Sequence, residues 1–342
     1  MKKQPVQILE GIYMVEVPFI QGLGQGDMTG TLCYLIQEKD GWLMVDSGYN
    51  DDGAFESLCQ QLDALDIPIE DIRELLITHY HPDHSGLALR IKEASGAKVI
   101  MHQDDWDILQ NAVGWGEKWT LDGLVEWAVT LGVPPSDLDR FYQAASLGRL
   151  LFPTGLEPDI LLQGEENVVA DDGHLQAILT PGHSPGHICL YDEKNKVFFS
   201  GDHVLVEITP HISPSHLTSY NQLGQYLESL RKVQHLDVEL VLPAHQWPFG
   251  HLAQRVDEIL EHHRRRLEEM VAALSDHPLS PWDLAPRVHW DVGPWEEMDA
   301  PTRVLAVRET LAHLQLLESR GQVAMVVSDG LHLYKLTNPS PE

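Results

Sequence analysis

One nine-residue segment limits the possible folds and functions of this chain more than any other. Residues 78–86 have the sequence Thr-His-Tyr-His-Pro-Asp-His-Ser-Gly, and Thr78 is the last residue of a short apolar run, 74–78, that predicts a β-strand. His79, His81, Asp83 and His84 therefore crowd into six positions at a strand end. Imidazole nitrogen and carboxylate oxygen are the usual ligands of Zn²⁺ and of Fe and Mn ions, and four such groups together would be poorly satisfied without a metal. The segment predicts a metal site rather than a solvated polar loop.

A single loop cannot complete the coordination of a metal, so distant ligands are expected at other strand ends. Three turns offer them: 180–187 (Thr-Pro-Gly-His-Ser-Pro-Gly-His), 200–203 (Ser-Gly-Asp-His) and 243–246 (Pro-Ala-His-Gln). Each follows a short apolar run, and Gly or Pro favours a tight turn that presents one ligand. The candidates are His183, Asp202 and His245. The neighbouring His187 and His203 are expected to pack or hydrogen-bond locally instead of binding metal.

The rest of the pattern predicts an α/β fold. Strands are expected at 8–17, 31–37 and 42–46, a helix at 55–65, and a helix and a strand at 87–95 and 97–101. A second strand-rich half is expected at 159–162, 168–169, 174–180, 187–192 and 196–200. It is followed by a helix at 223–233, a strand at 240–243 and a charged helix at 252–274.

The length of 342 residues suggests about two domains. We expect a catalytic domain over 1–274 that carries a helical insertion at about 102–152, and a C-terminal module over 275–342. The insertion could cover a pocket, although most of its aromatic residues are expected to pack its helices; they are Trp106, Trp115, Trp119, Trp127, Phe141 and Tyr142. The C-terminal module has helix signals at 280–284 and 303–320 and a hairpin at 323–336 turned by Asp329-Gly330, the order of a winged-helix fold.

Charge and composition limit the classes of partner and the cellular location that we expect for this protein. The chain has 23 Lys and Arg against 52 Asp and Glu, a formal net charge of -29, which disfavours nucleic acid and anionic membranes. No apolar run approaches the roughly 20 residues of a membrane helix, and residues 1–19 lack a signal-peptide core, so a cytoplasmic protein is expected. Cys33, Cys59 and Cys189 lie in apolar stretches and are expected to be buried, reduced thiols.

In the order in which they occur along the chain, the metal-ligand segments resemble the motifs of the metallo-β-lactamase superfamily. The likeness covers about the first three quarters of the chain and includes the Val-Asp-Ser-Gly turn at 45–48. It implies an αββα sandwich with two metals at one edge between the sheets. The implied ligands are His79, His81 and His183 for the first metal, Asp83, His84 and His245 for the second, and Asp202 for both. Asp46 is the candidate that orients a ligand histidine, and a simple Asx-turn is the alternative.

This resemblance implies hydrolysis. Two divalent ions lower the pKa of a bridging water from 15.7 towards about 7, so that hydroxide is available at neutral pH. Asp83 and Asp202 are the candidate catalytic residues, which would orient the hydroxide and return a proton to the leaving group. The substrate class favoured is a small ester-type molecule, a thioester or a lactone, and the metals favoured are zinc ions, with iron or manganese open.

Two other functions stay open. The winged-helix-like tail resembles that of the β-lactamase-like protein 2 group, some members of which are associated with RNA cleavage, so a ribonuclease or phosphodiesterase is one alternative. Against it, Arg303, Arg308 and Arg320 of the helix at 303–320 are partly offset by Glu309 and Glu318, which favours a structural or docking module. The other alternative is an iron-dependent enzyme of the persulfide-dioxygenase type, which the complete second ligand set disfavours. A homodimer is left open.

Overall fold

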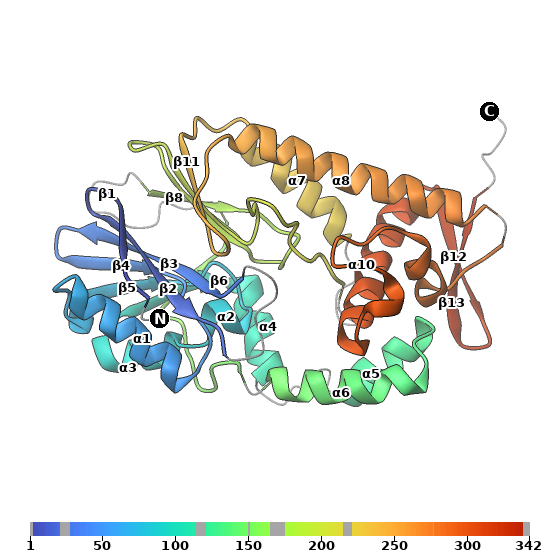
Figure 1. Ribbon diagram of the computed structural model, residues 1–342, viewed down its shortest axis with the longest axis horizontal. Helices are drawn as coiled ribbons and strands as arrows, with labels where there is room; N and C mark the ends of the chain where they lie inside the picture. The colour runs from blue at the N-terminus through green and yellow to red at the C-terminus, as the bar shows by residue number, and fades with distance from the viewer. Residues whose placement is uncertain are drawn as a thin grey trace. The chain divides into compact units, whose positions relative to one another are not determined.

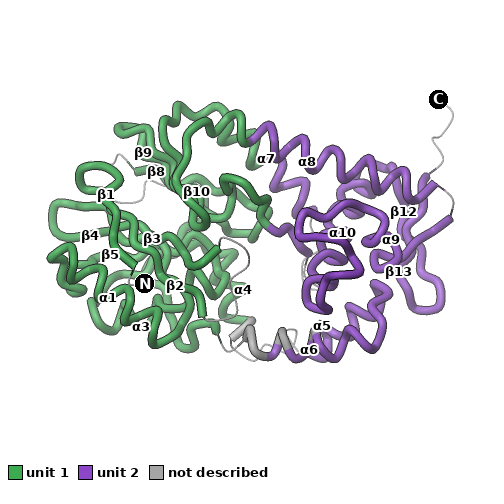
Figure 2. Tube along the Cα trace, in the orientation of Figure 1, with its two compact units in different colours: residues 1–114, 149–210, 229–255 green, residues 115–148, 211–228, 256–342 purple. Residues whose placement is uncertain are grey.

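The computed structural model describes residues 3–20, 28–113, 121–149, 151–164, 175–214, 221–275 and 277–337 (Figure 1). The chain forms two compact units (Figure 2). Unit 1 comprises Met1–Gly114, Arg149–Pro210 and Ser229–Arg255, and unit 2 comprises Trp115–Gly148, His211–Glu228 and Val256–Glu342. The expected domain limits 1–274 and 275–342, and the insertion limits 102–152, stay predictions.

Within the described part of unit 1, one sheet has seven strands in chain order: β1 (Val6–Leu9), β2 (Ile12–Pro18), β3 (Gly30–Glu38), β4 (Gly41–Val45), β5 (Ile72–Leu76), β6 (Lys98–His102) and β7 (Ile160–Leu162). Strands β1 to β4 pair antiparallel, and β4 to β7 pair parallel.

Two expectations about this sheet are wrong. The run 8–17 is not one strand, because Gly11 adopts a positive φ of 76° and turns the chain between β1 and β2. The strand at 159–162 is expected in the second half, but β7 pairs with β6 in the first sheet. Three apolar residues show that a strand exists, but they carry no information about its neighbour.

The second sheet has the order β11-β10-β9-β8, formed by β8 (Leu175–Leu179), β9 (Ile188–Asp192), β10 (Val197–Gly201) and β11 (Leu240–Pro243). Its first three strands in the chain pair antiparallel, and β10 pairs parallel to β11. The expected strands at 174–180, 187–192, 196–200 and 240–243 are confirmed with small shifts at their ends. The expected strand at 168–169 lies outside the described residues.

The two sheets face one another, as the alternation along their strands dictates. Strand side chains point to opposite faces in turn. In β3, Leu32 and Tyr34 pack towards the second sheet, whereas Cys33 and Leu35 pack towards the helices α1 (Asp52–Ala64) and α3 (Ala88–Ser95). On the second sheet, Ser229 and Lys232 of α7 (Gln222–Val233) donate hydrogen bonds to the carbonyls of Pro181 and Leu179. The expected αββα architecture is confirmed.

The strand directions bring the ligand turns to one edge. Because β10 and β11 run parallel, their carboxyl ends lie at the same edge, and the β8–β9 turn joins them there since β9 runs antiparallel to β10. Two backbone hydrogen bonds tie this edge to the first sheet: Ile188 N–H donates to the Thr78 carbonyl at 2.9 Å, and Leu32 N–H donates to the Ala244 carbonyl at 2.7 Å. The loop after β5 and the turns of the second sheet therefore meet.

The remaining described elements are mostly helical. They are α2 (Pro82–Ser85), α4 (Gln103–Val113), α5 (Leu121–Thr130), α6 (Pro135–Arg149), α8 (Leu252–Ala273), α9 (Pro281–Leu284), α10 (Ala300–Ser319), the hairpin strands β12 (Val323–Ser328) and β13 (Leu331–Leu336), and 3-10 turns at Ile69–Asp71, Ala285–Arg287 and Trp295–Glu297. The expected hairpin is confirmed, and both residues of its Asp329-Gly330 turn have positive φ. None of the helices in the described ranges has the length and apolar character needed to cross a membrane.

Candidate metal centre

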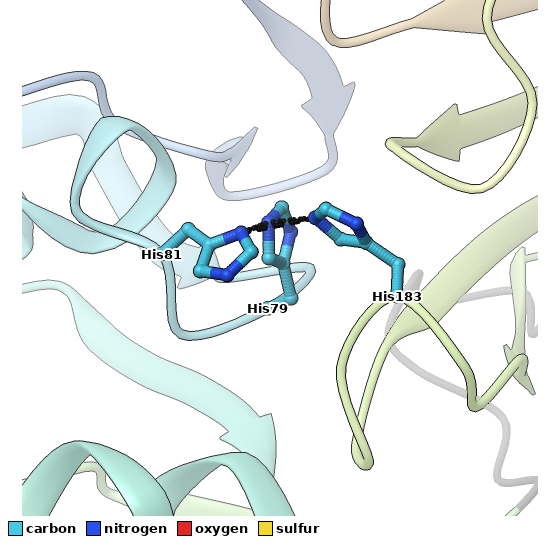
Figure 3. A group of neighbouring side chains, drawn as sticks. All are labelled: His79, His81 and His183. Carbon is cyan, nitrogen blue, oxygen red and sulfur yellow. Dashed lines mark hydrogen bonds between the residues drawn. The ribbon is translucent and has the colours of Figure 1, made fainter. Parts of the chain in front are cut away.

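Three imidazoles from two loops converge on one point (Figure 3). His79 Nε2 lies 2.9 Å from His81 Nδ1, and His183 Nε2 lies 2.9 Å from His81 Nδ1 and 3.2 Å from His79 Nε2. The first two residues leave the end of β5, and His183 occupies the turn after β8. Ligand nitrogens 2.0–2.1 Å from a shared zinc ion stand about 3.3 Å apart in a tetrahedral arrangement. The spacing of the three nitrogens fits a common cation.

A second group of donors lies beside the first. Pro82 begins α2, and its fixed φ suits a first helical position, so Asp83 and His84 fall within a single turn. One oxygen of Asp83, Oδ2, lies 3.6 Å from His84 Nε2 and 3.4 Å from His245 Nε2. The other ring nitrogen of His245 is 3.2 Å from the Gly30 carbonyl, to which it can donate, leaving Nε2 directed at the carboxylate.

Asp202 lies between the two groups and presents one oxygen to each. Its Oδ2 is 3.4 Å from His183 Nε2 and 4.0 Å from His79 Nε2. Its Oδ1 is 3.3 Å from His245 Nε2 and 3.6 Å from His84 Nε2. The structure thus brings together all seven residues that the sequence singled out as ligands.

The donor set fits divalent cations. His84 Nε2 and Asp202 Oδ1 are buried, and neither has a hydrogen-bond partner among the described residues. Burial would raise the pKa of Asp202, but His245 and His84 hold it well below its usual range. Burial would lower the pKa of His84, but Asp46 and Asp202 raise it well above its usual value. The low pKa of Asp202 means that this buried carboxylate is negatively charged, and the raised pKa of His84 reflects the negative charge of the carboxylates around it. Buried negative charge at this place attracts cations.

The first group of imidazoles is held neutral. Burial, reinforced by neighbouring imidazoles, lowers the pKa of His79 well below its usual value. Burial and His183 lower the pKa of His81 to about 3. A neutral imidazole has the free lone pair that binds a cation, so these residues need lose no proton near pH 7.

Asp46 forms hydrogen bonds with the start of the ligand loop and with one of its histidines. It is buried, and it accepts hydrogen bonds from the Thr78 N–H at 2.8 Å and from the Thr78 hydroxyl. Its Oδ2 also lies 2.8 Å from His84 Nδ1, which fixes the orientation of the ring and directs Nε2 at Asp83 and Asp202. The side chain thus contacts a ligand candidate, which a simple Asx-turn would not require.

His187 supports Asp202 without joining the donors. Its Nε2 accepts a hydrogen bond from the Asp202 N–H at 3.2 Å, and its Nδ1 lies 2.8 Å from the Thr180 hydroxyl. A Cβ at Gly201 would stand 2.8 Å from His187 Nε2, and Gly201 has a positive φ of 50°, so glycine allows this close approach. The local role expected for His187 agrees with this geometry.

Comparison with known proteins identifies the family. The model of the metallo-beta-lactamase superfamily matches residues 26–245, which include every donor described above. The chain belongs to this superfamily. It is 26% identical over 318 residues to the probable metallo-hydrolase YqjP of Bacillus subtilis, covering 91% of this chain and 93% of that protein. It is 28% identical over 176 residues to hydroxyacylglutathione hydrolase GloC of Haemophilus influenzae, covering 50% and 65%.

A solved structure of the superfamily has the same fold. The crystal structure of a metallo-beta-lactamase family protein from Thermus thermophilus matches 97% of this chain and 100% of its own, with a TM-score of 0.80 and 25% identity. The protein is therefore a metallohydrolase of the metallo-beta-lactamase superfamily, whose members typically bind two metal ions.

Aromatic side chains border the donors of this superfamily site. The ring of Phe19 lies 5.6 Å from that of His245 and 5.4 Å from that of Tyr49. Tyr80 contacts His81 and stacks on Phe152. Of the insertion aromatics, Trp106 packs against the helix-side core of the first sheet, as expected for most of them; Trp115 and Trp119 lie outside the described residues.

Sequence reasoning missed one residue of the site. Asp105, in the first turn of α4, is buried and accepts hydrogen bonds from Tyr80, Ser184 and Gly186. The available signal is its position three residues beyond β6, since carboxylates just after strand ends frequently serve active sites. The helical pattern of residues 102–152, which favours an insertion, conceals that signal.

Proposed function

We propose that the protein hydrolyses a small ester-type substrate, a thioester or a lactone, with two zinc ions. His79, His81 and His183 would hold the first ion, and the second would be held by the donors of α2 and the β11 turn, Asp83, His84 and His245. The observation that carries the proposal is Asp202, whose two oxygens face the two donor groups separately. A carboxylate in this position can bind both ions at once.

When bound, two such ions supply a water of lowered pKa and polarise the carbonyl oxygen of the substrate. The protein supplies the carboxylates. Positive charge on His84 and His245 lowers the pKa of Asp83 and Asp202 against the effect of burial, and cations bound by these histidines would supply that charge in their place, so both carboxylates are ionised at neutral pH. An ionised carboxylate accepts a hydrogen bond from the attacking water and orients it, and the one nearer the leaving group can return the proton.

Two observations support an acyl substrate. The aromatic rings of Phe19, Tyr49 and Tyr80 beside the donors suit the apolar part of an ester better than a phosphate. The relative from Haemophilus influenzae is named for hydrolysis of an acylated glutathione, and an acyl group on a thiol is a thioester. The net charge of -29 opposes the approach of RNA, which makes a ribonuclease the weaker alternative.

We also propose that residues 275–342 form a winged-helix-like module with a structural or docking role. The order α9, α10 and then the β12–β13 hairpin supports this interpretation, as does the pairing of Leu279 with Tyr334, which ties the segment before α9 to the hairpin. The cytoplasmic location, the small-molecule partner and the homodimer stay predictions.

The test combines elemental analysis with a substrate panel. Purified wild type, Asp202→Ala and the control Asp237→Ala, whose side chain is exposed, would be assayed against thioesters, lactones, phosphodiesters, RNA and a persulfide. We expect two zinc ions per wild-type chain, and thioester or lactone hydrolysis that falls in Asp202→Ala by at least roughly 100-fold and is unchanged in Asp237→Ala. Two bound metals with Asp202-dependent cleavage of RNA alone, or of no panel member, would contradict the proposal.

A further inference from the structure

Asp105 is a buried carboxylate that lies outside the proposed ligand set. It sits in the first turn of α4 with no exposed surface. The three hydrogen bonds that it makes within the described part of the chain all come from neutral donors. Its Oδ2 accepts from the Tyr80 N–H at 2.9 Å and the Ser184 hydroxyl at 2.6 Å, and its Oδ1 accepts from the Gly186 N–H at 2.6 Å.

These donors belong to the two loops that carry the first group of imidazoles. Tyr80 is the residue between His79 and His81, and Ser184 directly follows His183. The first loop leaves the first sheet and the second leaves the second sheet. One oxygen of Asp105 therefore joins loops of both sheets at the positions next to the ligand candidates.

The two peptide groups on either side of Tyr80 are each held by one hydrogen bond. The Tyr80 N–H, in the peptide that follows His79, donates to Asp105, and the Tyr80 carbonyl, in the peptide that precedes His81, accepts from the Ser85 hydroxyl at 2.9 Å. A peptide fixed by such a hydrogen bond cannot rotate freely. These two peptides set the directions in which His79 and His81 leave the backbone.

Gly186, in the second loop, lies very close to the start of α4. A Cβ at this glycine would stand 2.8 Å from the Asp105 N and 2.8 Å from His102 Nδ1. Any other residue would push the second loop away from α4. Glycine thus allows the loop that carries His183 to reach the carboxylate.

We propose that Asp105 is a positioning residue that sets the spacing of His79, His81 and His183 for the first cation. The inference rests on the proposed metal centre. Burying a carboxylate that has only neutral hydrogen-bond donors costs more free energy than burying an apolar side chain of the same size. The three hydrogen bonds to Asp105 offset this cost, and they form only when the two loops have this arrangement. The second cation should be insensitive to Asp105, because Asp46 and the start of β3 orient its histidines.

The test is a titration of metal-free protein with Co²⁺, followed by its visible absorption. Asp105→Asn is made in two backgrounds: His245→Ala, which keeps the first donor group, and His183→Ala, which keeps the second. In an asparagine the amide N–H₂ would face another donor. We expect Asp105→Asn to weaken Co²⁺ binding about 10- to 100-fold in the first background and less than about 3-fold in the second.

Asp104→Asn is the matched control, because Asp104 is the preceding residue, largely exposed, and makes no hydrogen bond to the described ligand loops. It should leave both affinities unchanged. Should Asp105→Asn fail to fold by circular dichroism, Ser184→Ala carries the test, since it removes one of the three bonds, and it should weaken the first site alone. Wild type that binds no Co²⁺ would remove the metal centre itself; wild type that binds two ions with no selective loss in the variants would overturn the role of Asp105 alone.

Discussion

At the scale of single residues, unit 2 contains a pair of histidines that burial keeps neutral near pH 7. His313 Nδ1 lies 2.8 Å from the Glu309 carbonyl, one turn earlier in α10, and donates to it. The other nitrogen of this neutral ring, Nε2, carries a lone pair and lies 3.1 Å from His263 Nδ1, from which it accepts a hydrogen bond. Burial lowers the pKa of His313 to about 4 and that of His263 well below its usual value.

This arrangement predicts acid sensitivity. An unfolded histidine titrates near 6.5, so between about pH 6.5 and about pH 4 the unfolded chain binds a proton at position 313 that the folded chain does not. The stability from this site is present above about pH 6.5 and lost as the pH falls to about 4, by on the order of 3 kcal/mol. In urea unfolding at several pH values, His313→Gln should show a shallower decline than wild type.

The control for this prediction is His289→Gln, because the His289 side chain is 77% exposed. Its pH dependence should match that of wild type. Equal slopes for wild type and His313→Gln would contradict the assignment of His313 as a buried neutral residue.

At the scale of elements, the start of β3 holds the turn after β11. Leu32 donates to the Ala244 carbonyl, the Tyr34 hydroxyl donates to the Pro243 carbonyl at 2.6 Å, and the Gly30 carbonyl faces His245 Nδ1. These contacts link the two sheets directly beside a ligand candidate. The same contacts therefore hold the two sheets together and orient His245.

Tyr34→Phe tests this link. The substitution leaves the buried Pro243 carbonyl without its partner, which should lower the free energy of unfolding by roughly 1–3 kcal/mol. Because the turn is released, Co²⁺ affinity at the group containing His245 should also fall several-fold. Tyr191→Phe is the matched control: the hydroxyl of Tyr191, in β9, donates to the carbonyl of Asp237, which precedes β11, so stability should fall with no change in metal affinity. Loss of stability alone in Tyr34→Phe would separate the two effects and refute the link.

At the scale of the whole molecule, all seven ligand candidates lie in unit 1, although they come from four segments between residues 79 and 245. Ions that bind only when these segments are assembled must stabilise the folded chain against the unfolded one. A concentration of free metal 100 times the dissociation constant contributes about 2.7 kcal/mol for each site.

Chelation should therefore lower the unfolding temperature. We expect EDTA to shift the calorimetric transition of unit 1 downward by several degrees, and zinc to restore it. Asp202→Ala, which lacks the shared carboxylate, should respond much less. An unfolding temperature that is identical with and without chelator in metal-loaded wild type would contradict a structural contribution of the ions.

Local patterns in the sequence determined much of this protein. The crowding of His79, His81, Asp83 and His84 predicts metal binding from residue chemistry alone, and the apolar runs that precede the turns of His183, Asp202 and His245 identify strand ends. The Asp329-Gly330 hairpin was equally predictable, since that dipeptide suits the positive φ of both positions. These features depend on neighbours within a few residues.

Only the tertiary structure decided the features that depend on distant partners. The two oxygens of Asp202 face different donor groups, β7 joins the first sheet, and Asp105 reaches from α4 to both ligand loops. The residues around Asp105 and β7 suit several environments, because periodicity records which face of a segment is buried and not which segment covers it. The partner of a buried polar group is set by the packing of the whole unit, and the sequence near that group carries no record of it.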